Sequence, residues 1–540
     1  LMLVKGREIP WNTVPELLRD KAERFGDAFF CEIYGRRLSY AELDRLSQAV
    51  ACGLVAHDIK KGGCVASYMY NCAEQLFGWF AAGRVGAIWA PLNAALSGDD
   101  LAYAVRDAGA TLLVVEDETW DRIAAIREKL PENLVLVGVG ECGKVNGVVP
   151  FEELILEGGA LPETDIGPGD PAMIIYTGGT TGLPKGVVLP HFAHVCAGLR
   201  YGEVLEARAG ERHYSTLPLF HAGGVQLGIV GPLFNDMTVV MDRRFSGSGY
   251  WQRVIEVDAD VIDPIGTMMT VLAQQEETPG ERDHHVRITT GVSGQLPESV
   301  PARFAERFGI DIVDIYGLTE AGGGMLTSNR LGYQVPDSVG RPHGWCEVAV
   351  VDALDQSQPA DVSGEIVMRP TVPFSFMLGY HNNAILTVEV MRNQWLHTGD
   401  IGRLDSAGNL FFEGRQVHWL RRRGENISAY EVENILSQHP AVEEVIVVGV
   451  PSELGEEEVK AYVMARAEAP DPVDLVEWCG TRMAAFKIPR FIEFVDDFPR
   501  SATKREVERG KVKDWGNANA WDRDRVMGRL SSQAQAKSGA

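Results

Sequence analysis

Helix-type and strand-type segments alternate after residue 65, and this alternation limits the fold more than any other feature of the chain. Val65–Tyr70 and Thr111–Val115 are short apolar runs typical of buried strands, whereas Ala73–Val85 and Asp99–Ala108 have the length and composition of helices. Strands that alternate with helices predict βαβ units and a parallel, doubly wound sheet. The same rhythm resumes after residue 172.

The pattern changes near residue 347, where short strands follow one another with frequent turns. Glu347–Val351, Gly364–Arg369 and Asn409–Glu413 are examples. Closely spaced short strands predict a small barrel or sheet. A chain of 540 residues is also too long for one core, since roughly 150 residues is usual for a domain. We expect a large N-terminal domain at 1–414, a hinge at 415–418, a small C-terminal domain at 419–515 and a flexible tail at 516–540.

Charge and cysteine content exclude several classes of protein. The formal net charge of -24 argues against a general nucleic-acid binder and against an anionic membrane surface. The eight cysteines form no C-x-x-C pair, which favours a reduced, cytoplasmic protein with buried thiols. The most apolar window, Gln75–Leu96, is interrupted by Arg84 and Pro91, so we expect no membrane span.

The segment Tyr176–Gly186 is rich in glycine and threonine and follows an apolar strand. Glycines let a backbone approach a ligand closely, and successive N–H groups, hydroxyls and an ammonium group can surround phosphate oxygens. A glycine-rich turn between two strands is the alternative. Lys185 is followed by Gly186, so the segment is not a G-x-x-x-x-G-K-[ST] loop. The predicted phosphate-binding residues are Thr177, Gly178, Gly179, Thr180, Thr181, Gly182 and Lys185.

Several further motifs occur in a fixed order along the chain. They are Tyr316-Gly-Leu-Thr-Glu320, Trp395-Leu-His-Thr-Gly-Asp400, Gly414-Arg415 and the run from Arg421 to Ser428. With the phosphate loop, these motifs resemble the adenylate-forming superfamily over roughly Glu8 to Lys513, and in particular its acyl-CoA ligase branch of carnitine/crotonobetaine-CoA ligase-like enzymes. The resemblance implies an α/β fold. It consists of a large N-terminal domain of two doubly wound α/β subdomains plus a small β-barrel, followed by a small mobile α+β C-terminal domain.

The resemblance also implies a reaction in two steps. A small-molecule carboxylate reacts with ATP, with Mg²⁺ as metal, to give an acyl-AMP and pyrophosphate. The thiol of coenzyme A then attacks the acyl carbon and displaces AMP. In the family the C-terminal domain rotates between the two steps.

Each motif has a chemical reason and a simpler alternative. Asp400 can accept both ribose hydroxyls, because a carboxylate accepts but does not donate; a turn-capping role is the alternative. Arg415 would contact ribose or phosphate, or be a surface arginine. Glu320 would hold Mg²⁺, or stabilise a helix N-terminus. Thr319 would contact the α-phosphate, and Tyr316 would stack on adenine or be a core aromatic.

The resemblance assigns the remaining site residues. His221 would lie between the acyl pocket and the coenzyme A tunnel, although a lone histidine is as often structural. The arginine run would bind coenzyme A phosphates, or be a solvated charge run. The adenine pocket is predicted at Gly294, Gln295, Asp314, Ile315, Tyr316 and Gly317, and the coenzyme A contacts at Arg421, Arg422, Arg423, Gly424 and Glu425.

Three positions depart from the family pattern. Gly178 stands where the family has serine, so one hydroxyl toward ATP is missing. The adenylation lysine falls on Arg505 when counted from Pro499 without gaps, or on Lys504 with one deletion. An arginine does not reproduce the compact ammonium group of a lysine. The hinge pair is Val417-His418 where many relatives have Lys-Asp.

These departures leave three hypotheses open. The protein is limited to thioesterification of an acyl-AMP made by a separate adenylating enzyme, or it is a full ATP-dependent synthetase that uses Lys504, or it is a non-catalytic adenylate-binding relative. A luciferase-like oxygenase and a peptide-synthetase loading domain have no supporting motif. A homodimer is a further expectation from base rates.

The acyl substrate is predicted only as a class. Phe220, Met268, Met269 and Gly322–Gly324 are expected to line the acyl pocket. Small glycines at that place would leave room for a bulky or aryl-ended acid of secondary metabolism.

Overall fold

The computed structural model describes residues 2–177, 184–291, 299–329, 334–415, 419–422, 425–452, 456–499, 507 and 509–526. Contacts between backbone positions divide the chain into two compact units. Unit 1 is Leu1–Ala94, Tyr103–Thr177 and Lys185–Gln416, and unit 2 is Ala95–Ala102, Gly178–Pro184 and Val417–Ala540. The mixed α/β class expected from the sequence is confirmed in both units.

The first large sheet of unit 1 has eight strands in the order β20-β11-β10-β6-β5-β7-β8-β9. Its strands from β10 to β9 pair in parallel, whereas β11 pairs antiparallel with β10 and with β20. Every residue of β5 and β7 is buried, as expected for parallel strands with both faces covered. The bounds are β5 (Cys64–Tyr68), β6 (Ile88–Pro91), β7 (Leu112–Glu116), β8 (Val135–Val139), β9 (Val149–Pro150), β10 (Pro171–Thr177), β11 (Lys185–Pro190) and β20 (Gly379–Tyr380).

The second large sheet also has eight strands, in the order β17-β16-β15-β14-β12-β13-β3-β4. The six strands from β16 to β3 are parallel, and β17 and β4 close the edges antiparallel. The two sheets are the two predicted doubly wound subdomains. The bounds are β3 (Phe29–Ile33), β4 (Arg36–Ser39), β12 (Arg212–Ser215), β13 (Thr238–Met241), β14 (Val261–Ile262), β15 (Ile288–Gly291), β16 (Asp311–Leu318) and β17 (Gly323–Asn329).

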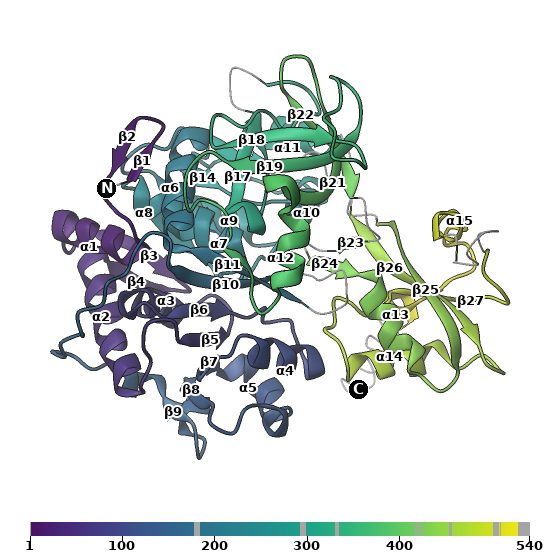
Figure 1. Ribbon diagram of the computed structural model, residues 1–540, viewed down its shortest axis with the longest axis horizontal. Coiled ribbons are helices and arrows are strands. Elements are labelled where there is room, and N and C mark those ends of the chain that lie inside the picture. The colour runs from purple at the N-terminus through teal and green to yellow at the C-terminus, as the bar shows by residue number, and fades with distance from the viewer. Residues whose placement is uncertain are drawn as a thin grey trace. The chain divides into compact units, whose positions relative to one another are not determined.

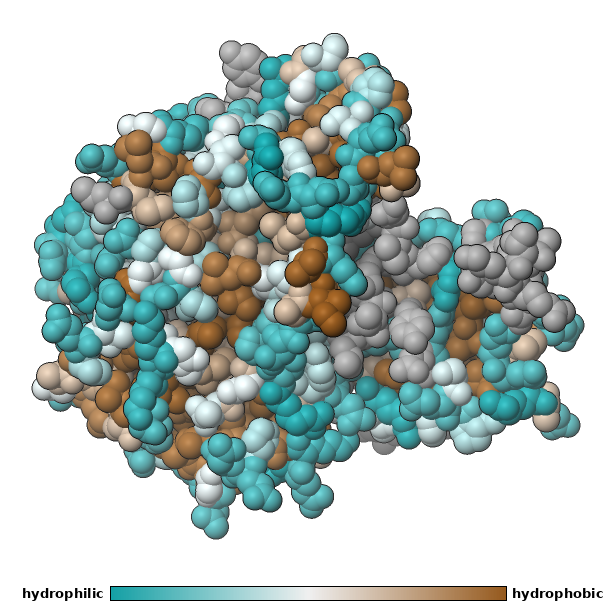
Figure 2. All heavy atoms as spheres, viewed as in Figure 1, coloured by the Kyte–Doolittle hydropathy of each residue, from teal (hydrophilic) through white to brown (hydrophobic). Residues whose placement is uncertain are grey.

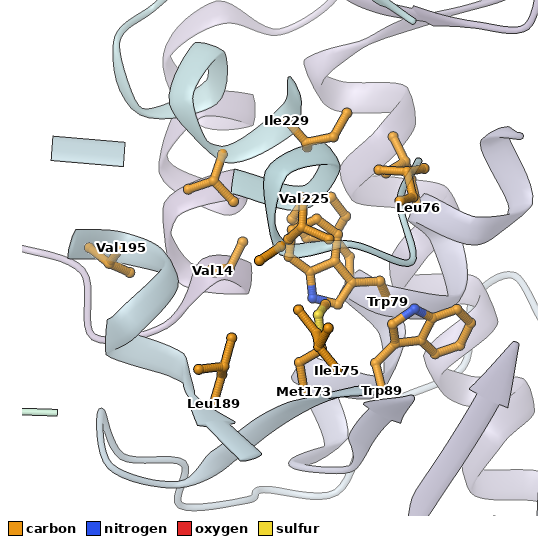
Figure 3. Packing of buried hydrophobic residues seen from close by; sticks show 14 of the residues in the cluster. Val14, Leu76, Trp79, Trp89, Met173, Ile175, Leu189, Val195, Val225 and Ile229 are labelled. Carbon is orange, nitrogen blue, oxygen red and sulfur yellow. The ribbon is translucent and has the colours of Figure 1, made fainter. Parts of the chain in front are cut away.

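One hydrophobic core joins both sheets through a group of helices (Figure 1). Side chains of α3 and β6 meet those of β10, with Trp79, Trp89 and Met173 close together (Figure 3). The Thr13 side chain accepts from the backbone of Glu16 in a capping box that begins α1. The bounds are α1 (Val14–Phe25), α2 (Tyr40–Ala56), α3 (Ala73–Val85), α6 (His191–Leu205), α7 (Ala222–Val225), the π-helix η4 (Gln226–Val230) and α8 (Gly231–Phe234).

Two histidines of α6 lie deep in unit 1. His191 and His194 are 2% and 0% exposed. Burial disfavours the charged imidazolium and lowers the pKa of His191 to about 4 and that of His194 to about 3. Both rings are therefore neutral at physiological pH.

The remaining helices of unit 1 cover the outer faces of the sheets or connect strands. Residues of α9, α10 and α11 form a separate aromatic core with Trp251 and Phe304. Helix α12 has no buried residue, and its Ile385 and Val388 are 77% and 71% exposed. Brown, hydrophobic atoms are visible near the middle of the face shown in Figure 2. The bounds are α4 (Gly98–Asp107, whose first residues belong to unit 2), α5 (Asp117–Ala124), α9 (Tyr250–Glu256), α10 (Thr267–Gln274), α11 (Ser299–Phe308) and α12 (Ala384–Val390).

A four-stranded antiparallel sheet forms the small β structure that the sequence predicts after residue 347. Its order is β18-β19-β21-β22, and the outer strands do not pair with each other, so it is an open half-barrel. A hairpin of β1 (Met2–Val4) and β2 (Arg7–Ile9) begins the chain. The bounds in the half-barrel are β18 (Cys346–Val351), β19 (Gly364–Pro370), β21 (Leu396–Leu404) and β22 (Leu410–Arg415).

Unit 2 is a small α+β body. A four-stranded sheet, β25-β26-β27-β28, packs with α13 and α14 around a core that includes Val447 and Leu475. A two-stranded hairpin of β23 and β24 precedes it. The bounds are β23 (Trp419–Arg422), β24 (Glu425–Ser428), α13 (Ala429–Ser437), β25 (Val442–Pro451), β26 (Glu457–Ala465), α14 (Pro472–Gly480), β27 (Phe491–Phe494), α15 (Arg509–Lys513) and β28 (Trp521–Asp522).

The predicted flexible tail is wrong for its first part. Trp521 and Asp522 form β28 on the edge of the sheet, and the Arg490 guanidinium lies 3.2 Å from the Asp522 carboxylate. The Trp521 side chain packs against the core of unit 2. Apolar packing and this ion pair therefore order residues that the polar end of the sequence suggested were loose.

A buried lysine in unit 2 lies between two carboxylates. Lys487 Nζ is 3.1 Å from Asp100 Oδ2 and also bonds to Glu431. Burial and the nearby Asp100 charge raise the pKa of Glu431 to about 7, against the opposing effect of Lys487.

Candidate active site

The predicted phosphate loop is bounded by the paired ends of two strands. In the register of β10 and β11, Tyr176 pairs with Gly186 and Thr177 with Lys185. The Tyr176 hydroxyl donates to Asp107 at 2.8 Å, which fixes the end of β10. The Thr177 hydroxyl oxygen is buried and has no hydrogen-bond partner among the described residues. An unsatisfied buried hydroxyl beside the loop fits a site that a ligand oxygen completes.

The predicted nucleotide residues Asp314, Ile315, Tyr316 and Gly317 lie on β16. The pairing with β17 shifts register between Tyr316 and Leu318. A Cβ on Gly317 would lie 2.4 Å from the carbonyl oxygen of Gly323, so only glycine fits this close approach. The shift turns the chain from β16 into the short helix η6 (Thr319–Ala321), which carries Thr319 and Glu320.

The structure brings Tyr316 and Asp400 into direct contact, although 84 positions separate them in sequence. The Tyr316 hydroxyl donates to Asp400 Oδ2 at 2.8 Å. Asp400 is 3% exposed on β21. In the pairing of β21 with β22, Arg415 lies opposite Asp400. Three of the residues predicted for adenine and ribose, Tyr316, Asp400 and Arg415, therefore lie on three neighbouring strands of two different sheets.

A set of hydrogen bonds fixes the turn before Asp400. Glu365 accepts from the backbone of Gly399 at 3.1 Å and lies 2.9 Å from His397 Nδ1. The Thr398 hydroxyl accepts from the Asp400 backbone at 3.0 Å and donates to the Ile366 carbonyl oxygen at 2.6 Å. The Leu-His-Thr-Gly sequence thus orients the Asp400 carboxylate.

Tyr380 links two predicted phosphate-site residues and was missed by the sequence analysis. Its hydroxyl donates to Glu320 Oε1 at 2.8 Å, and Lys185 Nζ lies 5.5 Å from the centre of its ring. The backbone N–H of Met377 donates to the Glu320 carbonyl oxygen at 2.9 Å. Tyr380 lies on the two-residue strand β20, whose pairing with β11 the sequence pattern did not indicate.

Glu320 and Thr319 provide one carboxylate and one hydroxyl for a cation. Mg²⁺ commonly takes one or two carboxylates and completes its shell with waters and substrate phosphates. The donor set therefore fits Mg²⁺ bound together with a nucleotide. Among the described residues no group of three or more His, Cys, Asp or Glu forms a preformed metal site.

His221 precedes α7 and is partly exposed. Its ring meets that of Phe220 edge to face, with ring centres 4.8 Å apart. Met268 is partly buried beside Thr216, whereas Met269 is 0% exposed inside the aromatic core of α9–α11. The prediction that Met269 lines a pocket is therefore wrong.

The prediction that Gly322 and Gly323 leave space for a bulky acid is also wrong. A Cβ on Gly322 would lie 1.9 Å from the carbonyl oxygen of Ser375, and one on Gly323 would lie 1.6 Å from Gln226 Oε1. The missing side chains let neighbouring groups approach. Only Gly324 has room, with its nearest neighbour at 3.6 Å.

Unit 2 requires a correction to the predicted coenzyme A contacts. Arg422 is 2% exposed, forms an ion pair with Glu458 at 2.5 Å and donates to the Phe486 carbonyl oxygen at 2.8 Å. A guanidinium group with these partners does not face a phosphate, so Arg422 is structural. Arg421 Nε lies 3.9 Å from Glu456, and Glu425 pairs with Arg422 across the hairpin.

The other predicted site residues lie outside the described part of the chain. They are Gly178, Gly179, Thr180, Thr181, Gly182, Gly294, Gln295, Arg423, Gly424, Lys504 and Arg505. The hinge pair Val417-His418 also lies outside it. No helix among the described residues has both the length and the apolar run that a membrane crossing needs.

Comparisons with known proteins agree with this arrangement. The family model described as AMP-binding enzyme matches residues 18–381, and the model described as AMP-binding enzyme C-terminal domain matches residues 431–505. The crotonobetaine/carnitine–CoA ligase of Salmonella heidelberg is 29% identical over 506 residues, which is 92% of this chain and 97% of the relative.

Two solved structures are similar over most of the chain. A double mutant of o-succinylbenzoate CoA synthetase from Bacillus subtilis, bound to a product analogue, has a TM-score of 0.80 and 25% identity, covering 93% of this chain and 98% of that one. The anthranilate CoA ligase AuaEII with anthranoyl-AMP has a TM-score of 0.71 and 26% identity, covering 93% and 97%. The chain therefore belongs to the AMP-binding enzyme family, in the acyl-CoA ligase branch of the adenylate-forming superfamily.

Proposed function

We propose that the protein forms an acyl-CoA thioester through an acyl adenylate, with AMP held between Tyr316, Asp400 and the end of β22. The hydrogen bond between Tyr316 and Asp400, at 2.8 Å, carries this proposal. A carboxylate fixed by a tyrosine at the meeting point of three strands is suited to accept two adjacent ribose hydroxyls.

The chain's own residues have separate roles in this proposal. Thr177 and Lys185 flank the phosphate loop and would contact phosphate oxygens. Glu320, oriented by Tyr380, would hold Mg²⁺, which supplies positive charge to those oxygens when bound. His221 would border the acyl group. Arg421 and Glu425 would lie near coenzyme A.

We infer further that the thioesterification step is faster than adenylation. Gly178 lacks the serine hydroxyl of the family pattern, and the ungapped register puts Arg505 at the adenylation lysine. The alternative is a full synthetase that uses Lys504. All eight cysteines are free and buried, which supports a reducing, cytoplasmic location.

Two half-reactions on the same sample test this proposal. The acids to be tested as substrates are crotonobetaine, o-succinylbenzoate and anthranilate, which appear in the names of similar proteins. We expect thioester from at least one acyl-AMP with coenzyme A, slow ATP–pyrophosphate exchange with the free acid, and faster exchange in Arg505→Lys. Rapid exchange by the unmodified protein would show a full synthetase. If the protein bound neither AMP nor coenzyme A in calorimetry, it would be a non-catalytic relative.

A further inference from the structure

Arg200 is a fully buried arginine whose main bond is to the turn that follows Glu320. It lies on α6, is 0% exposed, and its Nη2 donates to the carbonyl oxygen of Gly322 at 2.7 Å. Its Nε and Nη1 are also buried, and they have no hydrogen-bond partner in the described part of the chain.

The surroundings of Arg200 supply no negative charge among the described residues. The nearby thiols of Cys196 and Cys346 are neutral, since burial raises the pKa of each to about 12. The Trp345 ring lies 5.9 Å from the guanidinium carbon, at the limit of a cation–π contact. Burial lowers the pKa of Arg200 itself.

A buried cation without a carboxylate partner is unfavourable for stability. Even buried ion pairs are often replaced by apolar residues of similar volume at no loss of stability. A methionine at position 200 would avoid the desolvation penalty. We therefore attribute the role of Arg200 to its hydrogen bond with the Gly322 carbonyl group.

The backbone from Gly322 into the first residues of β17 needs to be held because its conformation is unusual. Gly322 has φ = 78°, Gly323 has φ = 99° and Met325 has φ = 63°. Left-handed backbone at a non-glycine residue such as Met325 stores strain that the surrounding structure must offset.

The same turn is also anchored at its other end. Tyr380 and the Met377 N–H bond to Glu320, and the Gly322 N–H donates to the Thr319 carbonyl oxygen at 3.0 Å. Arg200, which lies on α6, thus binds the chain just after Thr319 and Glu320 through the Gly322 carbonyl oxygen.

We propose that Arg200 is a positioning residue that holds the Thr319–Glu320 segment where the metal-bound nucleotide phosphates require it. This inference rests on the proposed function, because Glu320 is assigned to Mg²⁺ there. Positioning partners of a metal ligand change metal affinity or activity about 10- to 100-fold when they are removed.

The test measures Mg·ATP and AMP affinities separately by calorimetry. In Arg200→Met we expect Mg·ATP to bind about 10- to 100-fold more weakly. AMP should weaken less than about fivefold, because it keeps Tyr316 and Asp400 and loses at most the Thr319 contact to its phosphate. Arg200→Gln keeps an N–H donor without the charge, so its Mg·ATP affinity should lie between those of Arg200→Met and the unmodified protein.

Arg84→Met is the matched control. Arg84 is also buried, but its Nε donates to Ser47 at 3.1 Å and it pairs with Asp44 on α2. This variant should unfold more easily and show no difference between Mg·ATP and AMP.

Equal losses of Mg·ATP and AMP affinity in Arg200→Met would overturn the positioning role. So would a selective loss of Mg·ATP affinity in Arg84→Met. If Arg200→Met does not fold, Arg200→Gln decides: at least a threefold selective loss of Mg·ATP supports the role, and no selective loss refutes it. If the unmodified protein binds neither ligand, the proposed function itself fails, and this inference fails with it.

Discussion

At the scale of single residues, the proposed nucleotide site depends on the hydrogen-bonded pair of Tyr316 and Asp400. Asp400 is placed by backbone bonds around Thr398 and Gly399, and its orientation is completed by the Tyr316 hydroxyl. A carboxylate held in this way loses little conformational freedom when a ribose binds.

Substitution of Asp400 should weaken AMP binding more than substitution of Tyr316. Asp400→Ala should raise the AMP Kd about 10- to 100-fold, because hydrogen bonds to a charged group contribute about 1.5–3 kcal/mol. Tyr316→Phe removes only an orienting hydroxyl and should raise it about fivefold. Calorimetry measures both, and the double variant should be less than additive because the residues touch.

Tyr214→Phe is the control for this pair, since Tyr214 also donates to a carboxylate, Asp242, at 2.9 Å. Its AMP affinity should match that of the unmodified protein. Full AMP affinity in Asp400→Ala would contradict the placement of the ribose.

At the scale of elements, strand order assembles the site more than local sequence does. The described residues of the proposed nucleotide site lie on β10, β11, β16, β20, β21 and β22 and on the short helix η6. The motifs on β16 and β21 were recognisable in the sequence, and their proximity followed from the family resemblance. The contact of Tyr380 with Glu320 depends on β20, a strand of two residues whose pairing partner lies far back in the chain.

The glycines after Glu320 show why a local pattern can mislead. Small residues in a row suggested free space, because sequence does not reveal which neighbours fill a missing side chain. Ser375 and Gln226, which occupy that space, come from other parts of the chain. Arg422 is a similar case, since its run of arginines suggested exposure but Glu458 lies beside it.

Alanine substitutions in this turn should separate tight positions from open ones. Gly322→Ala meets the Ser375 carbonyl oxygen and needs φ = 78°, so we expect a loss of about 2–4 kcal/mol in the free energy of unfolding. Gly324→Ala meets nothing closer than 3.6 Å and should change it by less than about 1 kcal/mol. Denaturant titration measures both, and equal effects would show that the turn is not tightly packed.

At the scale of the whole molecule, the two units contain buried groups that respond to pH in opposite directions. In unit 1 the pKa values of His191 and His194 are lowered from 6.5, to about 4 and about 3. Their contribution to stability is present above pH 6.5 and is lost as pH falls toward 3. In unit 2 the pKa of Glu431 is raised from 4.5 to about 7, so its contribution is present below pH 4.5 and is lost as pH rises through 7.

Acidification from pH 8 to pH 5 should therefore weaken unit 1 and strengthen unit 2. Hydrogen exchange, corrected for its intrinsic pH dependence, should show less protection in α6 and more in α13. Glu431→Gln should remove the response of α13 while Lys487 keeps its bond to Asp100. Parallel changes in both helices would contradict the assignment.

The crowded backbone after Glu320 also limits how the enzyme can acquire new substrates. Gly322 and Gly323 cannot gain side chains without displacing Ser375 or Gln226, so random libraries at these positions should return mostly inactive protein. An added Cβ on Gly324 would meet nothing closer than 3.6 Å, so we expect substitution to be tolerated there. Directed evolution of acid preference would therefore proceed through Gly324 while Gly322 and Gly323 stay unchanged.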